Sequence, residues 1–150
     1  MDIISRPDPP DAIVSFDGQP NWIEITDAFQ SSAWARSMTT YAAEDKVHIP
    51  YQRGVIHEPD KEACQKVKEV IINKYQKQTI KGIYQTRGAG ILLVGIYTPL
   101  TTPQEIIELA GKEISEVILD HDPIFNSVYL YTNFENGHRF SLLHQVSKTI

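Results

Sequence analysis

The chain has 150 residues, of which 41% are hydrophobic and 22% charged, and its net charge is −5. This length suits one domain that can bury a core, so we expect a single domain over residues 1–150. No apolar run approaches the roughly 18 residues of a membrane span, and the first residues lack a signal-peptide pattern. A lone cysteine, Cys64, excludes an internal disulfide and a multi-cysteine zinc site. We therefore expect a cytoplasmic protein with no membrane partner.

The positive charges are concentrated in one part of the chain. Residues 61–87 carry seven Lys or Arg and two Glu, so this segment is at +5 while the remainder is at −10. A basic surface on an acidic protein can bind a phosphate backbone, and we expect this of Lys66, Lys68, Lys77 and Lys81. An ordinary solvated helix face with lysines explains the same run equally well.

The first third of the chain predicts an arm, a hairpin, a helix and a long loop. Residues 1–10 contain three prolines, which predicts an extended arm. Two apolar runs, 12–16 and 22–26, flank turn-forming residues at 17–21 and are typical of a β-hairpin. Asp27 is expected to cap a turn after the second strand. A helix should follow from Ser31 or Ser32 to about residue 43, and residues 46–60 should form a long loop.

The middle of the chain predicts a helix and a central strand. Asp60 is a suitable cap for a helix over 60–78, whose apolar stripe consists of Cys64, Val67, Ile71 and Tyr75. Residues 86–90 contain two glycines and are interpreted as a turn. The continuous apolar run 91–97 is typical of a central strand that is covered on both faces.

The last third predicts a helix and a second hairpin. Thr102 followed by Pro103 is an N-cap with proline at the first helical position, so we expect a helix to residue 119. Strands should occupy 127–131 and 139–143, joined by a turn at Asn136-Gly137. The element order predicts an α/β domain with a mixed central sheet flanked by helices.

Asp11 and Glu24 are the main candidates for chemistry. Side chains alternate along a strand, so Trp22, Glu24 and Thr26 share one face. Glu24 is then a carboxylate within an apolar strand, where an unpaired charge is costly and a metal ion would offset the cost. Asp11 begins the neighbouring strand and is placed to be a second ligand. The alternatives are a turn residue at Asp11 and an edge-strand Glu24 paired with a lysine.

Pro10-Asp11, followed after a turn by Glu24-Ile25-Thr26, resembles the PD-(D/E)xK nuclease superfamily. In that family Pro-Asp leads one strand and Glu-x-Lys ends the next. The resemblance implies a restriction-endonuclease-like fold and Mg²⁺-dependent cleavage of DNA phosphodiesters, with Mn²⁺ as an alternative ion. It also implies that Asp11, Glu24 and the main-chain carbonyl of Ile25 bind the metal. This chain departs from the family because Thr26 occupies the lysine position and no helix precedes the first motif.

Within the superfamily the lysine is sometimes supplied by the helix that follows the motif. At about 100° per residue, Lys74 lies about 60° from Ile71 and Gln78 about 20° from it, beside the stripe that faces the sheet. Lys74 is therefore the candidate for the displaced lysine, and Gln78 is expected to help hold water or phosphate. The alternatives are that Lys74 extends along the stripe to solvent and that Gln78 lies in a fraying last turn.

Three functions follow from these residues. The first is a Mg²⁺-dependent endodeoxyribonuclease with catalytic residues Asp11, Glu24, Lys74 and Gln78, acting on DNA rather than RNA. The second is an inactive protein of the same fold that serves as a protein-interaction or assembly module. The third is a nucleic-acid binder that does not cleave. Nucleic acid is the expected partner, with a protein partner or a homodimer as further alternatives.

Overall fold

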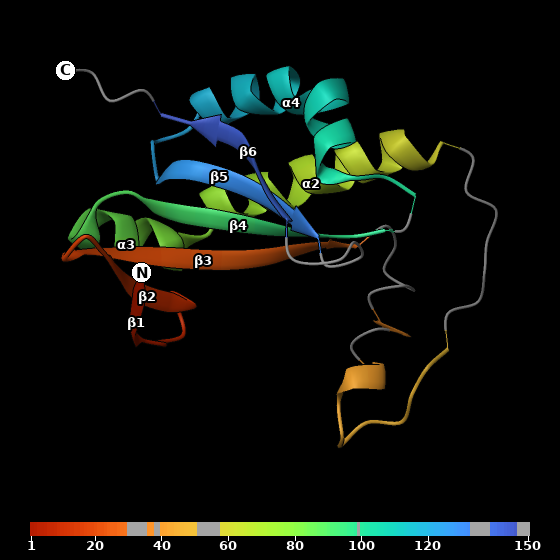
Figure 1. Cartoon of the computed structure of the whole chain (residues 1–150), viewed down its shortest axis with the longest axis horizontal. Coiled ribbons are helices and arrows are strands. Elements are labelled where there is room, and N and C mark those ends of the chain that lie inside the picture. The colour runs from red at the N-terminus through yellow and green to blue at the C-terminus, as the bar shows by residue number, and fades with distance from the viewer. Residues whose placement is uncertain (30–35, 38–39, 51–57, 99, 133–138, 147–150) are drawn as a thin grey trace.

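The computed structural model describes residues 1–29, 36–37, 40–50, 58–98, 100–132 and 139–146 (Figure 1). Within these residues, three strands are followed by two helices, a strand, a helix and two strands. The strands are β1 (Asp2–Ser5), β2 (Ala12–Phe16), β3 (Gln19–Phe29), β4 (Gly90–Tyr97), β5 (Phe125–Thr132) and β6 (Arg139–Gln145). The helices are α2 (Pro59–Gln76), α3 (Gln78–Arg87) and α4 (Pro103–Leu119).

The described strands form one six-stranded mixed sheet in the order β1-β2-β3-β4-β5-β6. β1, β2 and β3 are antiparallel neighbours, β3, β4 and β5 run parallel, and β6 is antiparallel to β5. The chain crosses between the parallel strands through helices, as parallel pairing requires. This confirms the mixed sheet flanked by helices that the sequence predicts.

The N-terminal hairpin matches its prediction in position but is tighter and longer. Phe16 pairs with Gln19, so the turn consists of Asp17 and Gly18 alone, both at positive φ (50° and 77°). Positive φ at both central residues is the geometry that twists a two-residue hairpin correctly. The second strand continues to Phe29, so Asp27 lies inside β3 and does not cap a turn. The expected arm is partly wrong, because residues 2–5 pair with β2 as a sheet strand.

The predicted helix 60–78 is divided into two helices. α2 begins at Pro59 and ends at Gln76, because Lys77 has an extended backbone (φ −67°, ψ 119°) before α3 begins. The cap prediction at Asp60 is wrong, since Glu58 holds the N-cap position, and the Asp60 carboxylate accepts a hydrogen bond from the Thr101 hydroxyl. α3 also extends to Arg87, into the segment interpreted as a turn.

The C-terminal elements follow the sequence more closely. Thr102 caps α4, and its side chain and that of Glu105 exchange hydrogen bonds with each other's backbone in a capping box. β5 and β6 include both predicted strands. The turn at Asn136-Gly137 lies outside the described residues, as do parts of the predicted helix up to residue 43, of which residues 36–37 and 40–42 are helical.

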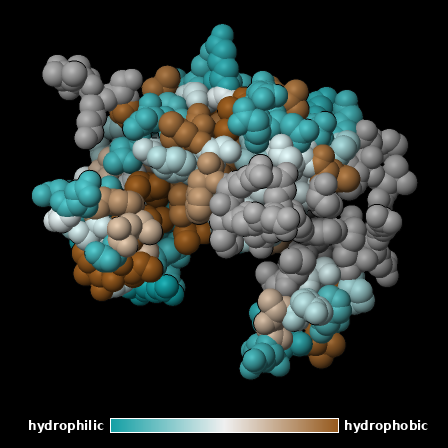
Figure 2. All heavy atoms as spheres, viewed as in Figure 1, coloured by the Kyte–Doolittle hydropathy of each residue, from teal (hydrophilic) through white to brown (hydrophobic). Residues whose placement is uncertain are grey.

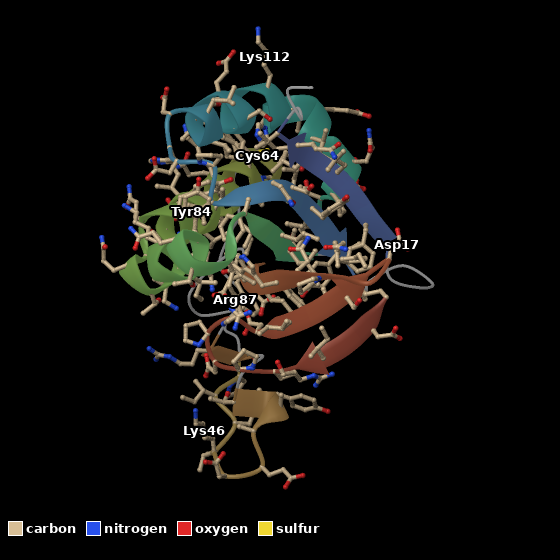
Figure 3. The ribbon with its side chains drawn as sticks, turned by 90° about the vertical axis from the view of Figure 1, so that its left-hand side faces the viewer. Asp17, Lys46, Cys64, Tyr84, Arg87 and Lys112 are labelled. Atoms are coloured by element: carbon tan, nitrogen blue, oxygen red, sulfur yellow. The ribbon has the colours of Figure 1, made fainter. Side chains whose placement is uncertain are left out.

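All three described helices with assigned bounds lie on one face of the sheet, as the view along the strands shows (Figure 3). On β4, Leu92, Val94 and Ile96 point to this face and are buried. The alternate residues Ile91 and Leu93 are half-buried, so the expectation that helices cover both faces of this strand is wrong for the described part of the chain. No described helix has the length and apolarity needed to cross a membrane.

The core beneath the helices is anchored by aromatic rings. The ring of Trp22 lies 5.3 Å from that of Phe125, which in turn lies 5.2 Å from Tyr75 on α2 (centroid distances). The Trp22 indole donates a hydrogen bond of 2.9 Å to the Gly88 carbonyl. Gly90 is required beside it, because a Cβ there would overlap the indole ring. This packing fixes the position of β3 against α2, and so the position of Glu24.

Candidate functional site

A buried ion pair joins β3 to α2. Glu24 points from β3 towards the helices with only 3% of its side chain exposed, and Lys74 Nζ lies 2.5 Å from Glu24 Oε1. Lys74 is 18% exposed, so its ammonium sits at the margin of the core. The helical-wheel argument placed Lys74 beside the apolar stripe that faces the sheet, and in the structure its ammonium contacts Glu24 there. It does not follow that either residue is catalytic, because an ion pair can also be purely structural.

The second carboxylate oxygen of Glu24 is unsatisfied within the described part of the chain. Glu24 Oε2 is buried and finds no hydrogen-bond donor among the described residues. A buried carboxylate oxygen without a donor loses its hydration and gains nothing in return. A cation or a hydrogen-bond donor beside this oxygen would offset that cost.

Asp11 lies just beyond the paired part of the hairpin. The β2–β3 ladder ends at Ala12 opposite Ile23, and the Asp11 carboxylate continues it by accepting a 2.7 Å hydrogen bond from the Ile25 backbone N–H. The N–H and C=O of one residue in an extended strand point to the same side. The Ile25 carbonyl is therefore directed to the edge of β3 where Asp11 lies, away from β4.

Asp27 is a charged residue of this region that sequence reasoning missed. It lies on the opposite face from Glu24, over Gly95, and its Oδ1 is buried without a partner among the described residues. Burial raises the pKa of the Asp27 carboxyl; the hydrogen bond from Tyr131 and the charge of Lys74 oppose this effect, and the charge of Asp11 adds to it. The pKa of Asp27 therefore depends on the charges of both Lys74 and Asp11.

Tyr131 shares this environment. Burial, followed by hydrogen bonding with Tyr97, raises the pKa of the Tyr131 phenol, so its hydroxyl stays protonated and can donate to Asp27. The signal for Asp27 was available in the sequence: its parity along the strand puts it on the face of Ile23 and Ile25. The assumption that the strand ends at Thr26 concealed it.

Thr26 and Gln78 offer less to a catalytic site around Glu24 than their positions in the sequence suggest. Thr26 is half-buried and offers a hydroxyl but no charge. Gln78 is exposed and is the first residue of α3, after the break at Lys77. Because the helix does not continue through residue 77, the angle extrapolated from α2 does not apply to Gln78.

The lysines proposed to bind nucleic acid are divided between the two helices, and two of them are already paired. Lys66 lies 2.7 Å from Glu69 and Lys68 lies 2.5 Å from Glu113 of α4. Lys77 is exposed at the helix break and Lys81 is half-buried on α3. The uncompensated positive charge is therefore concentrated nearer the end of α2 that carries Lys74 than the sequence suggests.

The oxygen atoms around β3 are of the chemical types that a small hard cation binds. Mg²⁺ is commonly held by one or two carboxylates together with waters and substrate phosphate, and a backbone carbonyl is a compatible ligand. Asp11, Glu24 and the Ile25 carbonyl are donors of this kind. No group of three His, Cys, Asp or Glu side chains suited to a metal occurs in the described part of the chain, so a cage formed by side chains alone is not found there.

Comparisons with known proteins find no family model, curated protein or solved structure that matches this chain. The nuclease interpretation therefore rests on the Pro10-Asp11 and Glu24-Ile25-Thr26 motif and on the geometry around Glu24.

Proposed function

We propose that the protein is a Mg²⁺-dependent nuclease-like enzyme that cleaves DNA phosphodiesters, with a restriction-endonuclease-like fold. The observation that carries this proposal is the position of Lys74. A lysine from the helix after the motif contacts the motif glutamate, so one ammonium lies against one carboxylate whose second oxygen is unsatisfied among the described residues. This combination supplies the charge that Thr26 lacks.

Each residue has a distinct role in the proposal. Asp11, Glu24 and the Ile25 carbonyl would hold the ion, and a bound Mg²⁺ or Mn²⁺ lowers the pKa of water and stabilises charge on a phosphate. Lys74 orients the attacking water and offers positive charge to the phosphate oxygens. Gln78, exposed at the start of α3, is assigned the weaker role of a hydrogen-bond donor to water or phosphate.

DNA is the proposed substrate because the basic residues nearest the site are suited to a phosphate backbone. Lys77 and Lys81 follow Lys74 around the α2–α3 break and can contact phosphates on either side of the reacting one. Lys66 and Lys68 contribute less, since glutamates already offset their charge. Binding through these contacts should weaken steeply with salt.

A cleavage assay tests the proposal. Supercoiled plasmid and single-stranded DNA are incubated with the protein in Mg²⁺, Mn²⁺ or EDTA. Glu24→Gln and Lys74→Met should each reduce the metal-dependent rate by about 100-fold or more, as removal of a charge-stabilising group does. Lys112→Met and Glu116→Gln, which break an exposed ion pair on α4, should cleave at the normal rate. Absence of cleavage by folded protein on both substrates, or equal rates in all variants, would refute the proposal.

The same observations favour one other function, an inactive protein of this fold that acts as an interaction module. Lys74 already neutralises Glu24, so the pair needs no metal to be stable. Apolar side chains are also exposed on the sheet face opposite the helices, among them Phe140 and Leu142. This alternative predicts neither metal binding nor cleavage, and a protein that remains functional with Gln at position 24.

A further inference from the structure

The ion pair between Lys74 and Glu24 uses the carboxylate that the proposed metal site needs. Lys74 Nζ lies 2.5 Å from Glu24 Oε1, and the Glu24 side chain is only 3% exposed. A carboxylate buried to this degree is costly without a cation beside it, and in the structure Lys74 supplies that cation. The ammonium that the proposed function assigns to a phosphate is therefore bound to the residue that it assigns to the metal.

Solvent reaches the pair on the side of Lys74. Lys74 is 18% exposed and its ammonium lies at the margin of the core, whereas the Glu24 carboxylate is almost fully enclosed. Hydrophobic residues gather in the middle of the other face of the sheet, as the space-filling view shows (Figure 2). An ion loses hydration on an apolar surface and gains nothing in return. Of the two partners, Lys74 is therefore the one that an ion from solvent meets first.

The charges of the proposed metal site are partly balanced before any ion binds. The Asp11 carboxylate accepts a hydrogen bond from the Ile25 backbone N–H, one residue beyond Glu24. Beside burial, the charges of Lys74 and Asp11 both affect the pKa of Asp27, so the two charges act over the same region. With Lys74 in place, one of the two carboxylate charges is already neutralised. The ammonium also repels a divalent ion beside Glu24, and salt screens this repulsion little because the pair is buried.

We propose that Lys74 and a divalent ion are alternative partners of Glu24, so that ion binding releases the Lys74 ammonium to a substrate phosphate. This inference rests on the metal part of the proposed function. Without the ion, Lys74 stabilises Glu24 and is held away from the substrate. When the ion binds, Lys74 leaves Glu24 Oε1, and its flexible side chain extends the ammonium into solvent at the margin of the core. The lysine thus becomes available only after the metal site is filled.

Calorimetric titration of Mg²⁺ into Lys74→Met tests the competition. Both carboxylate charges then face the ion with no ammonium to displace, so the variant should bind Mg²⁺ at least about tenfold more tightly than the wild type. Lys74→Arg keeps the positive charge and should bind no more tightly than the wild type. Lys112→Met removes a lysine of α4 that is 92% exposed and should bind as the wild type does. Equal or weaker binding by Lys74→Met than by the wild type would overturn the inference.

Thermal unfolding keeps the test informative, because Lys74→Met leaves a buried carboxylate without its partner. An ion that binds only the folded state raises Tm. Excess Mg²⁺ should raise the Tm of Lys74→Met more than that of the wild type, and should refold the variant if it is unfolded in EDTA. The double variant Glu24→Gln/Lys74→Met lacks the carboxylate and should show no rise. A rise for Lys74→Met no larger than that for the wild type, or failure of Mg²⁺ to refold it, would overturn the inference.

Acylation of lysine side chains, measured by mass spectrometry, follows the release of the ammonium directly. Lys74 should be acylated at least about fivefold faster in Mg²⁺ than in EDTA, because its ammonium no longer contacts Glu24. Lys112, which is 92% exposed, should react equally in both. A Lys74 rate that Mg²⁺ does not raise, in protein that binds the ion, would overturn the proposed release.

These outcomes separate the exchange from the proposed function. If the wild type binds Mg²⁺ through Glu24 and Lys74→Met binds it no better, the metal site stands and the exchange is wrong. If neither protein binds Mg²⁺, both are wrong. If Lys74→Met binds Mg²⁺ more tightly and the wild type cleaves no DNA, the exchange stands and the nuclease activity is wrong.

Discussion

Replacing Lys74 with Met should destabilise the protein strongly, and more than replacing its partner Glu24 with Gln. Met is of similar length but neutral, so the substitution leaves Glu24 as a carboxylate that is 3% exposed and has no counter-ion. Removing one partner of a buried ion pair costs about 3–5 kcal/mol. In a domain of this size 1 kcal/mol corresponds to roughly 2–4 °C, so Tm should fall by about 10 °C or more.

The opposite change should cost less. Glu24→Gln leaves Lys74, which is 18% exposed and can extend its ammonium towards water, so a loss of about 1–2 kcal/mol is expected. The double variant Glu24→Gln/Lys74→Met contains no buried charge at this position and should recover much of the stability lost in Lys74→Met. The measurement is a double-mutant cycle: urea unfolding of the wild type, the two single variants and the double variant, followed by circular dichroism.

Lys66→Met is the matched control. Lys66 and Glu69 form an ion pair on the same helix with both side chains about two-fifths exposed, and exposed pairs contribute roughly 0–1 kcal/mol. If Lys74→Met destabilises the protein no more than Lys66→Met does, the buried pair is not formed in solution and the site described here is incorrect.

Three further predictions concern other parts of the molecule. Asp27→Asn should raise the stability of the protein at neutral pH. The pKa of Asp27 in the folded state lies above its ordinary value. The ionised carboxylate therefore lowers the free energy of unfolding at pH values above that pKa, and this loss fades as the pH falls through it. Urea midpoints for the two proteins should differ near pH 7 and converge towards about pH 4; a constant difference would contradict this. Gly90→Ala should cost at least about 1–3 kcal/mol in thermal unfolding, because its Cβ overlaps the Trp22 ring, whereas Gly82→Ala on α3, where a Cβ meets nothing within 4 Å, should stabilise by about 0.5–1 kcal/mol. Thr102→Ala should cost about 0.5–2 kcal/mol by loss of the α4 capping box, and an unchanged Tm would show that the cap contributes nothing.

Short sequence motifs correctly predicted the turn of the first hairpin and the start of α4. Asp17-Gly18 supplies the positive φ values of a tight hairpin, and Thr102-Pro103 supplies a cap and a first helical residue. The angular spacing of α2 also predicted that Lys74 lies beside the stripe facing the sheet, and strand alternation predicted the face of Glu24; their contact depends in addition on how α2 packs against β3.

The errors arise where tertiary contacts override local preference. Nothing at Lys77 breaks a helix by composition, yet its backbone is extended, and α3 turns so that Ile80 is fully buried. Asp60 is a good cap by residue type, but its carboxylate bonds to Thr101 of a distant loop. The open sheet face was missed because a continuous apolar run does not reveal whether one or both faces are covered.

The most direct test of the account is a calorimetric titration of Mg²⁺ and Mn²⁺ into the wild-type protein, Asp11→Asn and Glu24→Gln. The account predicts binding of a divalent ion by the wild type, weaker binding by Asp11→Asn and none by Glu24→Gln, with all three proteins folded. Equal binding by the wild type and Glu24→Gln, or no binding by the folded wild type, would contradict the assignment of a metal-dependent site to Asp11 and Glu24.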